Sequence, residues 1–521
     1  MKFQVLVFYF SLFGFIACAP PEEEAMPQSR PNIIFLLADD LRDNMFSIDG
    51  HPDLKTPNFD RLIQNGVRFS NTYIAEPVCS PSRVSLFTGV HERVHGVGFS
   101  SSYQLTEDQW RHTYPALLRE NGYYTGFVGK IGIEYYTFKG AADQKFDFWY
   151  GHDGWTRFFP KDYDTPSTRP YHDANNDIIT PVMSEGIRQF LDSVPADRPF
   201  HLSVSFNVPH GSQTTSMYPG YEGWHSMIRP ANQNPKLQGR PPYDTLFRSA
   251  GLKIPEATTS DPYQYIPQSI LDQDGGRNKT YDYSYTRETC LEHHIRYYQT
   301  ITGLDLAIGD LMQALNEKGL EDNTIIIFAS DHGLLMGEYG MGGKALLYDL
   351  SSKIPCFIYH PGLPDSLKGR DLDQLVSSLD IPATILDYSE VPIPEVMEGK
   401  SLKPLMEAVE VSWRDELFLE SLFTLRDNPF CEGIRVGNWK YIRMFDGVNH
   451  YLEADLDFKN REPAFEQLFN LEADPDEVFN LAEVYANTEM LQTFREKVKS
   501  YSAHLNQKRI DYKTQYQVAE R

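Results

Sequence analysis

The chain has 521 residues, of which 41% are hydrophobic, and it carries a net charge of −24 at pH 7. This length is sufficient for one large domain and a smaller one. The negative charge argues against nucleic acid as a partner, because nucleic-acid binding needs a basic surface. An anionic substrate would require a locally basic site within this acidic protein.

The N-terminus predicts export. Residues 1–17 hold one lysine followed by an apolar run too short to span a bilayer comfortably, which is typical of a signal peptide. Ile16-Ala17-Cys18 looks like a bacterial lipoprotein cleavage box, and the acidic segment 18–30 indicates a tether. We therefore expect a lipid anchor on Cys18 that holds the protein in the outer membrane, facing the periplasm or the cell surface. A soluble periplasmic protein is the alternative.

Two segments that are far apart in the sequence have the same pattern, a predicted apolar strand that ends in acidic residues. They are RPNIIFLLADDLR (30–42) and LEDNTIIIFASDHG (320–333). Continuous apolar runs of this kind are typical of strands in a parallel sheet, which is buried on both faces. Ligands of open α/β sheets bind beyond the carboxyl ends of the strands. The residues expected together at that edge are Asp39, Asp40, Asp331 and His332.

The remaining pattern up to residue 362 alternates strands and helices. Apolar residues recur at three- and four-residue steps over 290–318, which predicts a helix, and Gly319 ends it. The segments 200–210 and 354–362 predict further strands that end in loops. Together these elements favour an α/β fold with a doubly wound sheet.

The amino-acid composition changes after residue 210. Residues 210–290 are rich in Pro, Gly, Tyr and Asn and predict a long insertion over the sheet edge. Residues 433–445 and 464–477 predict antiparallel strands, and 485–515 a polar helix. The predicted organisation is a signal peptide at 1–17, a tether at 18–30, a catalytic domain at 31–405 and a C-terminal subdomain at 406–521.

One cysteine stands out in the segment CSPSRVSLFTG (79–89), where Cys79 precedes Arg83 by four residues. A free cysteine is usually a small buried hydrophobe, and the chain has no CxxC pair or zinc-finger spacing. The clustered carboxylates suit Ca²⁺ or Mg²⁺ better than zinc. A thiolate does not match such hard-cation ligands, unless Cys79 is no longer a cysteine in the working protein.

The segment CSPSRVSLFTG resembles the complete signature of the type I sulfatases of the alkaline phosphatase superfamily. In that family the cysteine is oxidised to formylglycine (3-oxoalanine) by a formylglycine-generating or sulfatase-maturating enzyme. The resemblance covers about residues 31–485 and includes PNIIFLLADD, GYYTGFVGK, FNVPH and GMGGKALLYD. It implies a large mixed, mostly parallel sheet between helices, with a smaller C-terminal α+β subdomain built on an antiparallel sheet.

The resemblance also implies roles for individual residues. The ligands of one metal ion, calcium rather than magnesium, would be Asp39, Asp40, Asp331, His332 and the modified Cys79. Arg83 would orient the aldehyde hydrate. Lys130 and Lys344 would bind sulfate oxygens, and His210 would protonate the leaving alcohol.

One departure from the family pattern concerns the catalytic base. The family usually carries a histidine two or three residues after the first lysine, where GKIGIE has Gly132 and Ile133. That histidine normally helps to deprotonate the hydrate, so the base must come from elsewhere. We expect His95, in HERVHGVG, because a histidine titrates near neutral pH. A structural His95, a branch with a different base, or an impaired enzyme are the alternatives.

The sequence thus predicts a sulfuric ester hydrolase acting on sulfated carbohydrate, such as oligosaccharides derived from a polysaccharide. The variant GKIG followed by FDFWYGHDG resembles branches linked to use of the algal polymer ulvan. A formylglycine-type hydrolase of phosphonate or phosphate esters is the enzymatic alternative. A catalytically silent, glycan-binding homologue on the cell surface is the alternative from a different class.

Overall fold

The structure accounts for most of the chain outside its N-terminus. The computed structural model describes residues 30–99, 105–133, 142–152, 158–162, 164–165, 168–210, 235–254, 287–423, 428–445 and 461–516. The predicted signal peptide, Cys18 and nearly all of the tether lie outside these residues, as does most of the 210–290 insertion. In the described part of the chain, no helix combines the length and hydrophobicity needed to cross a bilayer.

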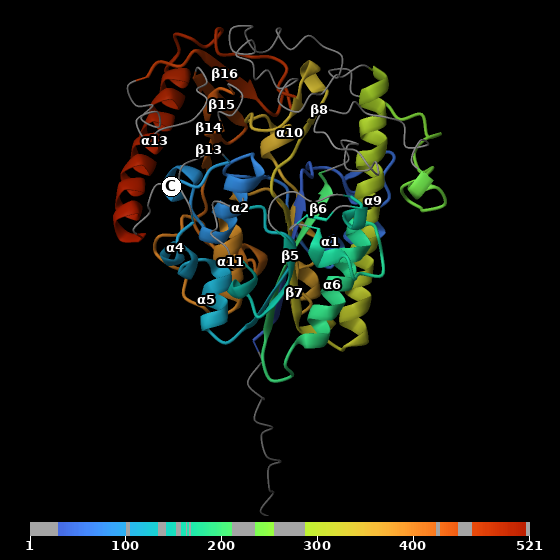
Figure 1. Cartoon of the computed structure of the whole chain (residues 1–521). Coiled ribbons are helices and arrows are strands. Elements are labelled where there is room, and N and C mark those ends of the chain that lie inside the picture. The colour runs from blue at the N-terminus through green and yellow to red at the C-terminus, as the bar shows by residue number, and fades with distance from the viewer. Residues whose placement is uncertain are drawn as a thin grey trace, which may run out of the picture.

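An eight-stranded mixed sheet forms the centre of the larger lobe (Figure 1). In spatial order its strands are β11 (Arg370–Leu372), β2 (Gly66–Phe69), β10 (Cys356–Tyr359), β7 (Thr324–Ser330), β1 (Asn32–Asp39), β6 (Phe200–Pro209), β4 (Tyr124–Lys130) and β5 (Phe148–His152). The five strands from β7 to β5 are parallel, whereas β10 runs antiparallel to both of its neighbours. The predicted fold class is confirmed.

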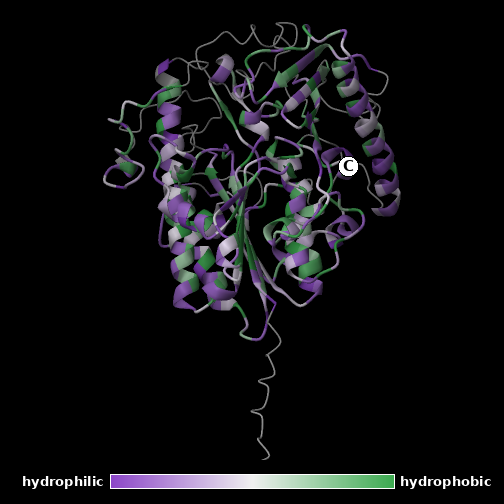
Figure 2. Cartoon of the chain, turned by 180° about the vertical axis from the view of Figure 1, so that it is seen from behind, coloured by the Kyte–Doolittle hydropathy of each residue, from purple (hydrophilic) through white to green (hydrophobic). Residues whose placement is uncertain are grey.

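Helices cover both faces of this sheet. One face packs against α1 (Pro57–Gln64), α6 (Ile179–Ser193) and α9 (Arg287–Glu317). The other packs against α2 (Cys79–Thr88), α5 (Tyr114–Glu120) and α11 (Asp380–Tyr388). Successive residues of β1 enter the two cores in turn, which is why its sequence is apolar throughout. Figure 2 shows hydrophobic colouring along the central strands and hydrophilic colouring on outward helix faces.

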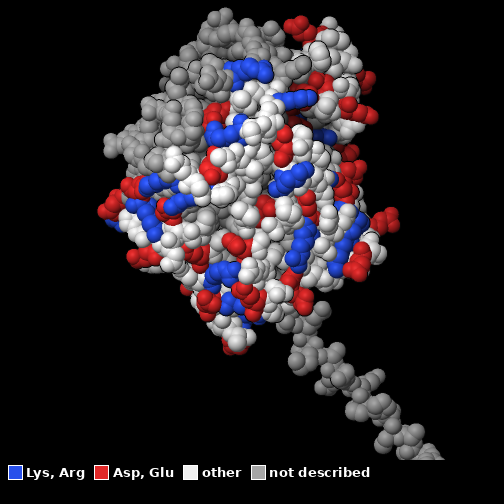
Figure 3. Space-filling model, turned by 90° about the vertical axis from the view of Figure 1, so that its right-hand side faces the viewer, with Lys and Arg blue, Asp and Glu red and all other residues white. Residues whose placement is uncertain are grey.

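Short elements complete the larger lobe. They are strands β3 (Thr72–Tyr73), β8 (Leu335–Met336), β9 (Gly342–Gly343) and β12 (Val376–Ser377), and helices α3 (Glu92–His95), α4 (Glu107–Arg111), α10 (Asp349–Ser352) and α12 (Lys403–Met406). The predicted domain boundary between residues 405 and 406 falls within α12. The surface of this lobe carries both signs of charge, and Figure 3 shows Lys and Arg interspersed with Asp and Glu on one face.

The second lobe is built on an antiparallel sheet covered by one long helix, as predicted. The sheet order is β13 (Glu416–Ser421), β14 (Phe430–Val436), β15 (Trp439–Phe445) and β16 (Phe465–Asn470). Helix α13 (Glu489–Tyr516) packs its apolar residues against this sheet and lies at the left of Figure 1.

A buried arginine joins the two lobes. Arg93, in α3, is fully buried, and its Nε lies 2.9 Å from Glu420 Oε2 on β13. The same guanidinium binds Glu432 on β14 and donates to Ser502 Oγ of α13 at 2.7 Å. Buried ions are stable only when they are paired, so this arginine fixes the second lobe on the helices that follow Cys79.

We predict that Arg93→Ala lowers the free energy of unfolding by roughly 3–5 kcal/mol, because it leaves buried Glu420 without its cation and removes one of the two arginines that pair with buried Glu432. Thermal melting measures the effect. The matched control is Arg188→Ala, which removes an exposed pair with Glu317 and should cost less than about 1 kcal/mol. Equal melting temperatures for the two variants would contradict the role of Arg93.

Candidate active site

The carboxyl ends of β1 and β7 bring four ligand-type side chains together. The two strands are parallel neighbours. Asp39 ends β1 and Asp40 follows it, while Asp331 and His332 follow β7. One ligand atom from each residue lies within 4.8 Å of the others, and all four residues are buried. The backbone N–H of Asp40 donates to Asp331 Oδ1 at 3.1 Å. The prediction that both acidic strand ends share one edge is confirmed.

Three cations face these three carboxylates. Lys130 Nζ, at the end of β4, lies 2.6 Å from Asp39 Oδ2. Lys344 Nζ lies 2.8 Å from Asp40 Oδ1. Arg83, on α2, donates from Nε to Asp331 Oδ2 at 2.9 Å. All three cations are buried, so these charge-assisted bonds act in a low-dielectric setting where they are strong.

The surroundings give the three carboxyl groups different pKa values. Burial alone would raise the pKa of Asp39, but the charge of Lys130 and other nearby cations holds it well below its usual value. Lys344 similarly lowers the pKa of Asp40 against the effect of burial. For Asp331, burial and the charge of Asp39 dominate and raise the pKa to about 7. The site therefore holds two strongly ionised carboxylates beside a third that resists ionisation.

The donor set fits a hard divalent cation. Among the described residues, Asp39 Oδ1 and Asp40 Oδ2 are buried oxygens without a hydrogen-bond partner. Such oxygens are costly unless something binds them, and carboxylate oxygens are the ligands that Ca²⁺ and Mg²⁺ prefer. His332 Nδ1 donates to the carbonyl of Gly333 at 2.8 Å, so its Nε2 lone pair remains on the carboxylate side.

Cys79 opens helix α2 within this cluster and is only 7% exposed. Burial would raise the pKa of its thiol, yet Lys344, Lys130 and a hydrogen bond with His332 lower it overall. Ser82 Oγ donates to the carbonyl of Asp331 at 2.7 Å and ties the helix to the end of β7. The sequence thus places a reactive side chain, a helix N-terminus and two lysines at one point, an arrangement that favours an anion.

Residues 31–391 match the family model described as Sulfatase, and residues 337–504 match the model described as N-sulphoglucosamine sulphohydrolase, C-terminal. The chain belongs to the sulfatase family. It is accordingly a sulfuric ester hydrolase, and its relatives support activity on sulfated sugars.

Curated relatives and a solved structure extend over nearly the whole chain. An arylsulfatase of Clostridium perfringens is 26% identical over 480 residues, covering 87% of this chain and 90% of the relative. An N-acetylglucosamine-6-O-sulfatase of Bacteroides thetaiotaomicron is 24% identical over 534 residues, covering 93% and 89%. A structure in complex with its substrate D-glucosamine-2-N,6-O-disulfate superposes with a TM-score of 0.67 at 20% identity, covering 94% and 98%. At this identity the last likeness shows the fold alone.

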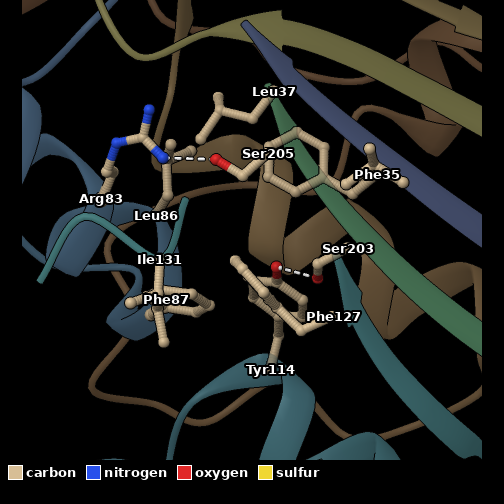
Figure 4. Close-up of a pocket in the computed structure, with 11 residues that line it drawn as sticks. Phe35, Leu37, Arg83, Leu86, Phe87, Tyr114, Phe127, Ile131, Ser203 and Ser205 are labelled. Atoms are coloured by element: carbon tan, nitrogen blue, oxygen red, sulfur yellow. Dashed lines mark hydrogen bonds between the residues drawn. The ribbon is translucent and has the colours of Figure 1, made fainter. Parts of the chain in front are cut away.

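Arg83 forms the back wall of this sulfatase's site. Its Nη1 donates to the carbonyl of Lys130 at 2.8 Å. It also donates to Ser205 Oγ, a hydrogen bond that Figure 4 shows. Behind it lies a cavity of about 20 Å³ lined by apolar side chains that include Phe35 and Phe127. That space suffices for about one water molecule, so the cavity is too small to hold a sugar.

The absence of a histidine after Lys130 has a steric explanation. Gly132 has φ +69°, and a Cβ there would lie 2.3 Å from Cδ of Arg83. Arg83 therefore occupies the space that any side chain at this position would need. Ile133 is fully buried in the core of the α2 face and cannot take the role either.

The structure places His95 beneath helix α2, apart from the carboxylate cluster. Its Nε2 contacts Ser85 Oγ at 3.1 Å, and its Nδ1 accepts from the backbone N–H of Val97 at 3.0 Å. Burial lowers its pKa to about 3. Both ring nitrogens thus form local hydrogen bonds. The expectation that His95 is the catalytic base is therefore corrected, and we assign His95 a structural role.

His210 lies where the sequence placed it. It follows β6, its backbone N–H donates to the carbonyl of Asp39 at 2.8 Å, and its Nε2 lies 3.9 Å from Asp40 Oδ2. Burial lowers its pKa to about 4 against the opposing charges of Asp40 and Asp39. The described site also contains two residues that sequence reasoning missed, His152 and Asn207. The available signal was that each lies near the carboxyl end of a predicted strand, in the segments FDFWYGHDG and FNVPH.

We predict that Ca²⁺ raises the melting temperature of the wild-type protein and that a chelator lowers it. Binding to the folded state alone stabilises by about 2.7 kcal/mol at a hundredfold excess over Kd. Asp331→Asn should remove most of this calcium-dependent shift, whereas Asp108→Asn, on the surface helix α4, should retain it. A wild-type melting temperature that is insensitive to Ca²⁺ would count against the cation site.

We predict that His95→Ala reduces stability by about 1–3 kcal/mol, because it unpairs buried groups around α2, and leaves kcat per folded molecule unchanged. Melting curves and active-site-normalised kinetics give the two quantities. A folded variant with strongly reduced kcat would restore His95 to the catalytic machinery.

Proposed function

We propose that this sulfatase acts through formylglycine at position 79 with one calcium ion bound by Asp39, Asp40, Asp331 and His332. The observation that carries the proposal is the position of Cys79. It begins a helix, it carries the family signature, and it lies among Lys130, Lys344 and the carboxylate cluster. A bound Ca²⁺ would act as a Lewis acid toward sulfuryl oxygens.

The residues of the chain have separate tasks in this proposal. Formylglycine as its hydrate supplies an oxygen nucleophile on residue 79, which Arg83 holds in place. Lys130 and Lys344 offset the charge that develops on the sulfuryl oxygens in the transition state. His210 donates a proton to the leaving sugar oxygen, and the arriving anion favours its protonated form.

Charge balance explains how an acidic protein attracts an anionic ester. When Asp331 is counted as ionised, the three carboxylates and three cations of the site cancel formally. A divalent cation then gives this buried region a net charge of about +2, while the chain as a whole remains at −24. The site is thereby the locally basic region that the sequence required.

The substrate class is sulfated carbohydrate. We propose glucosamine sulfates as the first candidates, because the Bacteroides thetaiotaomicron relative is named for N-acetylglucosamine 6-sulfate and the solved neighbour holds a glucosamine disulfate. Ulvan oligosaccharides remain a prediction from the sequence. The charged cluster at Asp39 and Asp331 is present in full, which argues against the silent, glycan-binding alternative.

We also propose that the protein is exported and anchored through lipid on Cys18. The support is the lone lysine, the apolar run and the Ile16-Ala17-Cys18 box of the sequence. A sulfatase-maturating enzyme acting on Cys79 belongs to the same proposal.

The test combines peptide mass spectrometry with sulfate release. We expect an aldehyde at position 79 that reacts with a hydrazide probe, and sulfate release from a panel of glucosamine sulfates and ulvan oligosaccharides. Cys79→Ala should lower kcat on the order of 10⁴–10⁶-fold, because the nucleophile is lost.

The matched control is Cys431→Ala, at a buried cysteine of β14, which should retain turnover per folded molecule. An unmodified thiol throughout fully active enzyme would overturn the formylglycine proposal. Faster hydrolysis of a phosphonate monoester than of every sulfate ester would favour the alternative activity.

A further inference from the structure

A second histidine lies at the sheet edge beside Lys130. His152 ends β5, and the parallel register of β4 and β5 pairs it directly with Lys130. Paired residues of neighbouring strands project their side chains on the same face of a sheet. Lys130 is 3% exposed and His152 is 2% exposed, and the charge of Lys130 acts on the His152 ring.

Two neighbours orient the His152 ring. Nδ1 forms a hydrogen bond with the hydroxyl of Tyr171, which is itself fully buried. The amide of Asn207 contacts Nε2 at 3.4 Å, a long distance for a hydrogen bond. With the Asn207 amide N–H directed at Nε2, we assign the ring proton to Nδ1, where it faces Tyr171. Nε2 therefore presents a weakly engaged lone pair.

The groups beside this lone pair are acceptors that can bind an O–H donor. Asn207 Oδ1 is buried and, within the described residues, has no hydrogen-bond partner. Burial and the charges of Lys130 and Arg83 lower the pKa of His152 to about 3, which keeps the ring neutral. A neutral imidazole with Nε2 unprotonated can accept a proton but cannot donate one there.

Geometry also favours His152 over the alternatives. The position two residues after Lys130 is closed by Arg83, and both ring nitrogens of His95 are engaged elsewhere. His210 lies by the carboxylate Asp40 and is assigned to the leaving group. The charges acting on the His152 ring are those of Lys130, Arg83 and Asp39, all members of the site.

We propose that His152 is the general base that releases sulfate from residue 79, an inference that rests on the proposed formylglycine function. After transfer, the carbon of residue 79 carries one hydroxyl and one sulfate ester oxygen. Nε2 of His152 takes the hydroxyl proton, and the O–H electron pair forms the C=O bond. The bond from that carbon to the ester oxygen breaks, sulfate leaves with its electron pair, and the aldehyde is restored. Tyr171 is a positioning residue that holds the required tautomer.

The experiment compares His152→Gln and His152→Ala with wild-type protein, each first shown to carry the aldehyde at position 79. The probes are glucosamine 6-sulfate and 4-nitrophenyl sulfate. We expect kcat to fall roughly 10²–10⁴-fold in both variants. Each variant should have the same kcat for both probes, because the slow step no longer involves the leaving group.

Intact-protein mass provides a readout independent of turnover. A sulfuryl adduct on residue 79 should accumulate in the His152 variants, whereas His210→Ala should slow the first half of the reaction and accumulate no adduct. Glutamine can accept a hydrogen bond but cannot take up a proton at neutral pH. Restoration of kcat in His152→Gln would therefore overturn the base role.

The matched control is His201→Gln. His201 is also a buried histidine with its pKa lowered to about 3, but it lies near the start of β6, paired with Ile33 and Thr125 at the far end of the sheet. This variant should lose stability and retain kcat without an adduct.

Three results would overturn the proposal: an unchanged kcat in His152→Ala, a change in KM alone, or a fall in kcat without the adduct. If wild-type protein carrying the aldehyde releases no sulfate from either probe or from the wider panel, the proposed function falls and this proposal falls with it.

Discussion

The structure depends on keeping three carboxylates and three cations together in a buried place. An ion removed from water is stable only if counter-charges and hydrogen bonds replace the lost hydration. Lys130, Lys344 and Arg83 meet this demand at distances of 2.6 to 2.9 Å. Because the paired ions come from several elements, their pairing fixes the ends of β1, β7, β4 and α2 relative to one another. The same pairing leaves two carboxylate oxygens for a metal, so stability and function share one set of contacts.

The charged side chains of the site are already in position before a substrate binds. In the proposed reaction the cations need not move toward the sulfuryl group, since carboxylates and backbone already hold them in position. Preorganised charge of this kind acts without reorganisation at the moment of reaction. The histidines around it are kept neutral by burial, and each has a different neighbour: Asp40 for His210, and Tyr171 with Asn207 for His152. In the proposed mechanism these different neighbours give two similar side chains opposite directions of proton transfer.

The sequence predicted the features that depend on local pattern. The apolar runs before Asp39 and Asp331 gave both central strands, and their acidic ends gave the carboxylate cluster. The direction of β10 could not be predicted, since periodicity contains no information on strand polarity. His152 was missed because its proximity to Lys130 arises from strand register, a non-local property. His95 was chosen for its closeness to Cys79 along the chain, but the short helix α3 turns its ring onto Ser85.

The contact between Arg93 and Ser502 has a consequence for the order of events during synthesis. The two residues are 409 positions apart, which corresponds to roughly 20–80 s at about 5–20 residues per second. Until the last helix emerges, Arg93 has its two glutamates but lacks its hydrogen bond with Ser502, and the segment from Cys79 to α3 cannot complete its packing. Contacts of such sequence separation also slow folding. The nascent chain thus has a period in which Cys79 is accessible, and the proposed conversion to formylglycine must occur before that period ends.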